Sequence, residues 1–278
     1  MTSLKRVSLL LLCLCLLIGC HREQPQALTV TVLDVGQSDC TLVVQGDAVL
    51  MIDAGTATQR EAVRAALRTR RIKEIDCLLL THPHEDHYGN ARMLIENFTV
   101  KLLILSPVAV DDWGYQLVLQ AAIERGVAIC YAEAGDQFPL GSASLEVLAV
   151  CAEAEDVNDT SVIARLLYGN TAFLFTGDSE EEAEAYLLST VLPEKLACDF
   201  LKAGHHGSDT STGVALLQMA NPTHVAISCG KYNDYGFPHA ALLERLAAVG
   251  AAVYRTDQEG DLCYSSDGAT VTFQGNGK

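Results

Sequence analysis

Basic residues are scarce in this chain. It has 19 lysines and arginines against 35 aspartates and glutamates, which gives a formal net charge of −16. A surface of that sign repels the phosphate backbone of nucleic acid, because binding a long duplex requires many lysine and arginine contacts. The composition therefore counts against an extended nucleic-acid footprint. It does not exclude a single phosphodiester group held at metal ions.

The chain also lacks cysteines in CxxC spacing, although it has ten cysteines. Most of them lie within apolar runs, where a thiol behaves as a small hydrophobic side chain. There is no linker rich in proline, glycine or serine, and no supersecondary unit repeats at a fixed period. We therefore expect one domain, over residues 28–278.

A long apolar run stands at the N-terminus. Two basic residues precede Val7–Ile18, and this run is too short for a comfortable membrane span, so it predicts a signal peptide over residues 1–19. The sequence LIGC that ends at Cys20 resembles a bacterial lipobox, in which the cysteine becomes the lipidated first residue. We expect an extracytoplasmic lipoprotein anchored in the cell membrane through Cys20, with residues 20–27 as a tether. An ordinary cleaved signal or a short anchor helix is the alternative.

Strands and helices mix along both halves of the remaining chain. Alternating apolar residues predict a strand at 28–35 and a hairpin around Gly46-Asp47. Residues 59–70 show the helical period, with arginines on one face and apolar residues on the other. This mixture predicts an α/β fold in which two sheets pack face to face with helices outside.

The densest cluster of potential metal ligands is Thr81-His82-Pro83-His84-Glu85-Asp86-His87. It follows the mostly apolar run 75–80, which indicates a loop at the end of a buried strand. Imidazole and carboxylate side chains suit zinc, manganese or iron. A solvated polar turn is the alternative, but it does not account for so many ligand types at one strand end. We therefore expect a metal site here.

Further candidate ligands follow other strand-like segments. Asp53, Asp178 and the pair His205-His206 each stand directly after a short apolar run. A packed sheet that delivers ligands from its strand ends to one edge is a rigid scaffold for a two-metal site. The candidates therefore predict one shared site rather than several separate ones.

Together these segments resemble the metallo-β-lactamase fold superfamily, whose HxHxDH signature is matched by residues 82–87. The nearest pattern is that of the hydrolase domain of the DNA-uptake competence protein ComEC and its free-standing relatives. The matching segments are LDVGQSDCTLV (33–43), NDTSV (158–162), TGD (176–178), LKAGHHGSDTST (201–212), YGFPHAALLERL (235–246) and VYRTDQEG (253–260). The resemblance covers residues 28–273 and implies an α/β fold, the four-layer αββα sandwich.

The resemblance also implies two divalent metal ions, zinc or manganese. The implied ligands are His82 and His84 for the first ion, Asp86 and His87 for the second, Asp178 as the bridge, and one of His205 and His206, with His206 favoured, to complete the second site. Asp53 would lie behind the ligands and hydrogen-bond their loop, which fixes the orientation of an imidazole.

One ligand usual in the superfamily is missing, because residues 88–177 contain no histidine. The first ion would therefore lack its third imidazole. It would bind weakly, take a water or an oxygen of Asn158 or Asp159, or be a harder ion such as manganese. Asn158 and Ser161 are expected to support the ligands from this segment.

The implied mechanism is hydrolysis by a water that bridges two cations, which lower its pKa and neutralise charge on a phosphoryl group. Asp86 or Asp178 would orient that water, and His239 would protonate the leaving oxygen or contact a phosphate oxygen. Lys202 and Ser208 flank the ligand loop and would hold a phosphate. The structural alternatives are a helix-capping neighbour for His239 and a solvent-facing strand residue for Lys202.

Three functions are compatible with these features. The first is a lipid-anchored phosphodiesterase acting on nucleic acid or on a small or cell-wall phosphodiester, and the acidic charge favours a small or single-stranded substrate. The second is hydrolysis of an amide or thioester, including β-lactams, against which the missing histidine counts. The third is a non-catalytic accessory protein for DNA uptake, against which the near-complete ligand set counts.

Overall fold

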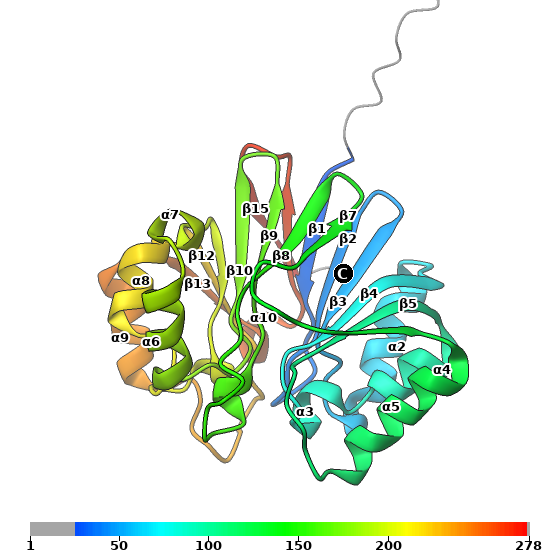
Figure 1. Cartoon of the computed structure of the whole chain (residues 1–278). Helices are drawn as coiled ribbons and strands as arrows, with labels where there is room; N and C mark the ends of the chain where they lie inside the picture. Colours follow the sequence, from blue (N-terminus) through cyan, green and yellow to red (C-terminus); the bar gives the residue numbers. More distant parts are fainter. Residues whose placement is uncertain (1–25, 277–278) are drawn as a thin grey trace, which may run out of the picture.

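The structure, a computed structural model, describes residues 26–276 (Figure 1). The expected signal peptide (1–19), the lipidation site Cys20 and most of the 20–27 tether lie outside these residues. Within the described part, none of the helices combines the length and the apolar character needed to cross a bilayer.

The first sheet contains eight strands and is built mainly by the N-terminal half. Their order is β15 (Val271–Asn276), β14 (Leu262–Ser266), β1 (Leu28–Val32), β2 (Thr41–Gln45), β3 (Ala48–Ile52), β4 (Glu74–Leu80), β5 (Thr99–Leu105) and β6 (Ala128–Tyr131). Neighbours are antiparallel from β15 to β3 and parallel from β3 to β6. The pair β2–β3 confirms the predicted hairpin, with Val43 opposite Leu50.

The second sheet contains seven strands. Their order is β13 (Ala252–Arg255), β12 (His224–Ile227), β11 (Phe200–Lys202), β10 (Thr171–Phe175), β9 (Ile163–Tyr168), β8 (Ala143–Ala149) and β7 (Gln137–Leu140). Neighbours from β10 to β13 are parallel, and those from β7 to β10 are antiparallel. The pattern of apolar residues did not predict β7, because Pro139 interrupts it; proline is tolerated in this strand because it lies at the sheet edge.

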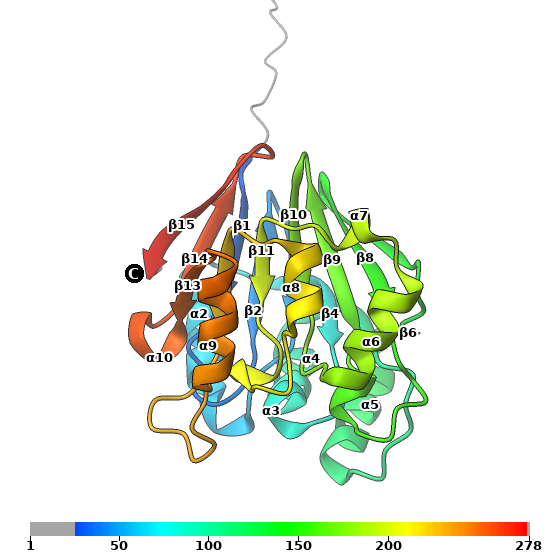
Figure 2. The same cartoon turned by 90° about the vertical axis from the view of Figure 1, so that its left-hand side faces the viewer.

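Helices cover the outer face of each sheet, so four layers stack as helix, sheet, sheet and helix (Figures 1 and 2). The first sheet carries α2 (Arg60–Thr69), α4 (Ala91–Asn97) and α5 (Trp113–Arg125), and the second carries α6 (Glu181–Thr190), α8 (Val214–Ala220) and α9 (Ala240–Ala248). Short helices complete the set: η1 (Ala57–Gln59), α3 (Glu85–Tyr88), η2 (Asn158–Thr160), α7 (Pro193–Leu196), η3 (His205–Gly207) and α10 (Thr256–Glu259). The α/β, four-layer αββα prediction is confirmed.

Aromatic side chains fill the space between the two sheets. Phe200 of the second sheet and Tyr264 of the first are both fully buried, and their ring centroids lie 4.7 Å apart in an edge-to-face arrangement. Complete burial of such a side chain stabilises the fold by roughly 1.5–3 kcal/mol. This packing holds the two sheets in a fixed relation, which matters because both contribute residues to one site.

The outer helices follow from simple sequence patterns. In α2, Val63, Ala66 and Leu67 recur at the helical period and are buried against the first sheet. Helix α5 ends at Gly126, whose φ of 67° lies in the left-handed region that glycine adopts without steric cost. The strands between these helices end in loops that carry the polar residues described next.

Candidate metal centre

The histidine-rich segment leaves β4 and turns at once into the short helix α3. His84 precedes that helix in an extended conformation, and its carbonyl accepts backbone hydrogen bonds of 3.0 Å from His87 and Tyr88. The turn buries His82 and His87 completely, whereas His84 and Asp86 are partly exposed and line a cavity. One short turn thus carries three imidazoles and the carboxylate of Asp86 within residues 82–87.

Asp53 supports this turn from the end of β3. Its Oδ1 atom accepts a 2.8 Å hydrogen bond from the backbone N–H of Thr81, and its Oδ2 atom lies 2.8 Å from Nδ1 of His87. Burial raises the pKa of Asp53, even though the neighbouring His87 favours its charged form. With the Nδ1 proton of His87 directed at Asp53, the lone pair on Nε2 is left to face the side of Asp178.

Asp178 reaches the same point from the second sheet. It follows β10 through Gly177, which adopts a φ of 55° and approaches so closely that a Cβ atom would lie 2.8 Å from Oγ of Ser161. The backbone N–H of Asp178 donates to the same Ser161 hydroxyl at 3.0 Å. Ser161 Oγ also lies 3.3 Å from Nδ1 of His82, so it links the two sheets directly beneath the site.

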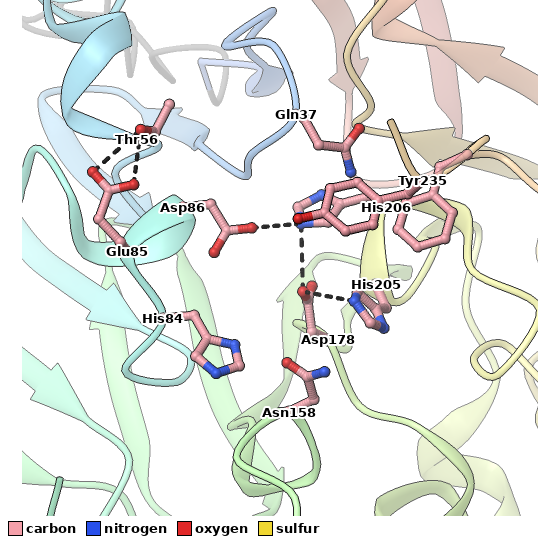
Figure 3. Close-up of a pocket in the computed structure, with 11 residues that line it drawn as sticks. Gln37, Thr56, His84, Glu85, Asp86, Asn158, Asp178, His205, His206 and Tyr235 are labelled. Atoms are coloured by element: carbon pink, nitrogen blue, oxygen red, sulfur yellow. Dashed lines mark hydrogen bonds and ion pairs between the residues drawn. The ribbon is translucent and has the colours of Figure 1, made fainter. Parts of the chain in front are cut away.

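Four potential ligand atoms converge at this point, one each from Asp86, His87, Asp178 and His206, and all lie within 4.8 Å of one another. Oδ2 of Asp178 lies 3.2 Å from Nε2 of His87. It lies 3.4 Å from Nε2 of His206 (Figure 3). Burial opposes the charge of Asp178, but the two imidazoles outweigh it and hold the pKa of that carboxyl well below its usual range.

The donor set fits a divalent cation. Nε2 of His87 and Oδ1 of Asp178 are buried without a hydrogen-bond partner, which is costly unless another ligand satisfies them. Imidazole nitrogens together with carboxylate oxygens suit zinc and manganese. The group therefore offers four candidate ligand atoms for one ion.

A second group lies beside it, around His82 and His84. Nε2 of His82 and Nδ1 of His84 are 3.0 Å apart. Burial lowers the pKa of His82 well below its usual value, which keeps this imidazole neutral and able to bind a cation. Asn158 lines the same cavity, and its Oδ1 atom is buried without a hydrogen-bond partner.

Asp159, the other residue considered as a replacement for the missing histidine ligand, has a different role. Oδ1 of Asp159 accepts hydrogen bonds of 2.7 Å and 3.1 Å from the backbone N–H groups of Glu180 and Ala183, so it caps the start of α6. This leaves Asn158, rather than Asp159, as the candidate oxygen donor, since Asn158 lines the cavity together with His84.

The adjacent residues His205 and His206 point their side chains at different partners. His206 belongs to the four-ligand group, with its Nε2 atom 3.1 Å from Oδ2 of Asp86. His205 turns the other way: its Nδ1 atom lies 2.6 Å from Oε1 of Glu180, and its Nε2 atom is 4.0 Å from Asp178. Both residues have positive φ, 44° and 52°, an uncommon backbone for residues other than glycine that lets them diverge.

The site opens into a cavity of about 490 Å³ between the two sheets (Figure 3). The view places His84, Glu85 and Asp86 on one side of it and Asp178 and His205 on the other. Its lining residues are Gln37, Thr56, His84, Glu85, Asp86, Asn158, Asp178, His205, His206, Tyr235 and Phe237. A small substrate group can therefore reach the candidate ligands from solvent.

Comparison with known proteins agrees with the fold. A family model described as the metallo-beta-lactamase superfamily matches residues 33–144. The chain is a metallo-β-lactamase fold protein. The structure of the metallo-beta-lactamase fold protein YhfI from Bacillus subtilis shares this fold with a TM-score of 0.59 at 13% identity, covering 87% of this chain and 100% of that one.

Curated relatives of this metallo-β-lactamase fold protein include competence proteins, consistent with a ComEC-like branch. ComE operon protein 3 of Bacillus subtilis is 37% identical over 210 residues, which cover 74% of this chain and 26% of that protein. Competence protein ComA of Neisseria gonorrhoeae is 28% identical over 255 residues, which cover 89% of this chain and 34% of that protein. The chain thus spans about a quarter to a third of the length of these relatives.

The metallo-β-lactamase fold here also uses a buried ion pair that the sequence motifs did not predict. Lys202, which ends β11, is only 3% exposed, and its ammonium group contacts the carboxylate of Asp39. Asp39 in turn lies 3.3 Å from Nδ1 of His206. The interpretation of Lys202 as a solvent-facing strand residue is therefore wrong. Lys202 also does not line the cavity. Its ammonium group is paired with Asp39 behind the candidate ligands.

Asp39 lies in the LDVGQSD segment and was missed as a site residue. Burial opposes its charge, but Lys202 and His206 lower the pKa of its carboxyl. The only sequence signal was an acidic residue between Ser38 and Cys40 in a segment that carries the family resemblance. Asp39 thus lies on the Nδ1 side of His206, but the hydrogen-bond partner of that Nδ1 atom is the carbonyl of Ser228 at 3.1 Å, whereas Asp53 itself bonds Nδ1 of His87.

Two other predicted residues lie away from the cavity lining. Ser208 is 4% exposed, and its hydroxyl lies 2.8 Å from that of Thr210. His239 immediately precedes α9; its Nδ1 atom lies 2.8 Å from Asp209, and its Nε2 atom lies 3.3 Å from the carbonyl of Tyr235. Their assignments to phosphate binding and proton donation stay predictions, and the geometry gives both side chains local partners instead.

Proposed function

We propose that the protein is a metal-dependent phosphodiesterase. The observation that carries this proposal is the convergence of Asp86, His87, Asp178 and His206 within 4.8 Å, beside a second group formed by His82 and His84. Two divalent ions, zinc or manganese, would occupy the two groups. When bound, such ions activate water and neutralise the charge that develops on a phosphoryl group.

The chain's own residues would orient the metal ligands and contact the substrate. Asp178 is the expected bridging ligand of the four-ligand group, and the bond from its own N–H to Ser161 fixes its backbone. Asp53 orients His87 from behind, and the carbonyl of Ser228 orients His206. His205, held through Nδ1 by Glu180, lines the cavity and is placed to contact an oxygen of the substrate.

A phosphodiester is the favoured substrate for two reasons. The group formed by His82 and His84 has Asn158 rather than a third imidazole nearby. An amide oxygen together with carboxylates suits a harder ion of the kind that phosphoryl transfer uses. A relative named for competence also supports a substrate connected with nucleic acid. Amide or thioester hydrolysis has no comparable support from the site.

The expected location is outside the cytoplasm, with Cys20 lipidated and residues 20–27 as the tether. The support is the basic start, the apolar run and the Gly19-Cys20 junction in the sequence. Metabolic labelling with a radioactive fatty acid tests this part separately: label in the wild type and none in Cys20→Ala is expected, whereas equal label in both would contradict the anchor.

The test of the activity uses the full chain, purified in detergent and stripped of metal, with bis-p-nitrophenyl phosphate and increasing Mn²⁺ or Zn²⁺. Metal-dependent turnover is expected, and His84→Ala is expected to lower kcat/KM at least about 100-fold. His224→Ala is the matched control, because His224 lies on β12 and does not line the cavity. A folded protein that binds metal but does not hydrolyse this ester, with either ion, would contradict the proposal.

A further inference from the structure

The loop between β12 and α9 places aromatic side chains at the opening of the cavity. Tyr235 and Phe237 both line the cavity, and their rings stack with centroids 5.4 Å apart and an interplanar angle of 17°. Phe237 packs edge-to-face on His205 at 5.5 Å, which fixes it close to the candidate ligands. Tyr235 covers the outer side of Phe237 and is itself 67% exposed. One broad aromatic face of the cavity therefore lacks a protein neighbour.

The loop is held by specific hydrogen bonds. The Nδ2 atom of Asn233 donates to the carbonyls of Gly230 and Phe237 at 2.9 Å and 2.8 Å, and its Oδ1 atom accepts from the N–H of Phe237 at 2.9 Å. The N–H of Gly230 donates to Oε1 of Gln37 at 3.0 Å, which ties the loop to the first sheet. Tyr235 is thus presented to the cavity on a braced loop rather than on a free one.

Burial energy does not explain this placement. A tyrosine with two-thirds of its surface exposed contributes little to the core, and it lies beside a site whose lining is rich in carboxylates. An exposed aromatic face at a binding cavity is a surface on which a planar ring can stack. Such stacking also offers affinity that does not depend on attraction between charges, which is scarce on an acidic protein.

We propose that Tyr235 is a stacking platform for a nucleobase of the substrate, so that the site selects nucleotide phosphodiesters over phosphodiesters that lack an aromatic ring. This proposal rests on the phosphodiesterase function proposed above and specifies its substrate class. Every nucleobase has a stacking face, so the platform selects nucleotides without selecting their sequence. A single braced ring at one cavity fits a single strand or a nucleotide end, whose bases are unpaired, better than a paired duplex.

The test compares two oligomers of equal length and equal charge: a short thymidine strand and a strand of abasic deoxyribose spacers. The full chain is loaded with the ion that supports hydrolysis of bis-p-nitrophenyl phosphate, and KM and kcat are measured for both oligomers. The wild type is expected to show a KM roughly tenfold lower for the thymidine strand. Tyr235→Ala is expected to remove this difference by raising KM for the thymidine strand alone, with little change in kcat.

Two further variants separate stacking from other effects. Tyr235→Phe retains the ring and is expected to retain the discrimination. Tyr232→Ala is the matched control, because Tyr232 lies on the same loop, is 91% exposed and does not line the cavity. It is expected to behave as the wild type.

The outcomes distinguish the two proposals. Equal kcat/KM on both oligomers in the wild type would overturn the role of Tyr235, and so would hydrolysis of bis-p-nitrophenyl phosphate without cleavage of either oligomer; in both cases the phosphodiesterase function would stand. Discrimination that Tyr235→Ala leaves intact would also overturn it. Absence of bis-p-nitrophenyl phosphate hydrolysis with either ion would refute the phosphodiesterase function itself, and the platform with it.

Discussion

Oδ2 of Asp53 lies 2.8 Å from Nδ1 of His87, and this contact determines which nitrogen of the imidazole faces the site. Asp53→Asn keeps the shape of the side chain but removes the charge that holds the Nδ1 proton. We expect the protein to bind divalent ions 10- to 100-fold more weakly, the usual effect of changing a residue that orients a metal-binding histidine. Calorimetric titration of the metal-free protein with Mn²⁺ or Zn²⁺ measures the change.

Asp76→Asn is the matched control for this experiment. Asp76 is also a carboxylate that accepts from a backbone N–H, that of Val49 at 2.8 Å, but it lies within β4 and bonds Lys101 on the surface. Its substitution is expected to leave metal affinity unchanged. Equal affinities for Asp53→Asn and Asp76→Asn would show that Asp53 does not orient a ligand.

Asn158 offers a second test of the ligand sets. Its unpartnered Oδ1 atom faces the cavity beside the histidine pair that lacks a third imidazole. Asn158→Ala is therefore expected to weaken one of the two metal equivalents about tenfold or more and to leave the other unchanged. Equilibrium dialysis against buffered Mn²⁺ resolves the two equivalents, and an equal loss at both would contradict the assignment.

Much of this site is predictable from sequence, because its residues sit at strand ends. Asp53, His82 and Asp178 each lie within three residues of the end of an apolar strand, and strands that end at one edge bring their next residues together. A short signature such as HxHxDH adds the order of the ligands along one turn. These are local features, so a single chain without coordinates is enough to reveal them.

The buried pair Asp39–Lys202 is not predictable in this way. Asp39 lies in the loop between β1 and β2, and Lys202 ends β11 of the other sheet, so their contact depends on how the two sheets pack. A lysine beside a polar loop is most often exposed. No feature of the sequence identifies Asp39 as the ion-pair partner of Lys202. The same limit applies to Tyr235, whose place at the cavity depends on the course of a loop.

The buried pair Asp39–Lys202 is expected to stabilise the fold only while both of its charges are present. Lys202→Met would leave the carboxylate of Asp39 buried without its cation, which typically lowers the free energy of unfolding by about 3–5 kcal/mol. The double variant Asp39→Asn/Lys202→Met removes both charges and is expected to recover a large part of that loss. Urea unfolding of the metal-free proteins gives the free energies, and strictly additive losses in the two single variants and the double variant would contradict a coupled pair.

Glu184 predicts a pH dependence that is independent of the metal ligands. It is 6% exposed on α6, and its carboxylate accepts hydrogen bonds from the backbone N–H groups of Thr212 and Gly213. Burial outweighs these bonds and raises the pKa of Glu184 from 4.5 to about 7. Because the folded state binds this proton more tightly than the unfolded state, the stability is fully present below pH 4.5 and is lost as the pH rises through 7.

The expected size of this effect is about 3 kcal/mol between those two pH values, since one pKa unit corresponds to about 1.4 kcal/mol. Glu184→Gln keeps an acceptor for the backbone N–H groups and cannot titrate. Urea unfolding at a series of pH values should therefore show a decline in wild-type stability, relative to Glu184→Gln, as the pH rises from 4.5 to 7. A constant difference between the two proteins across this range would show that Glu184 is ionised throughout, and that the two backbone N–H groups outweigh its burial.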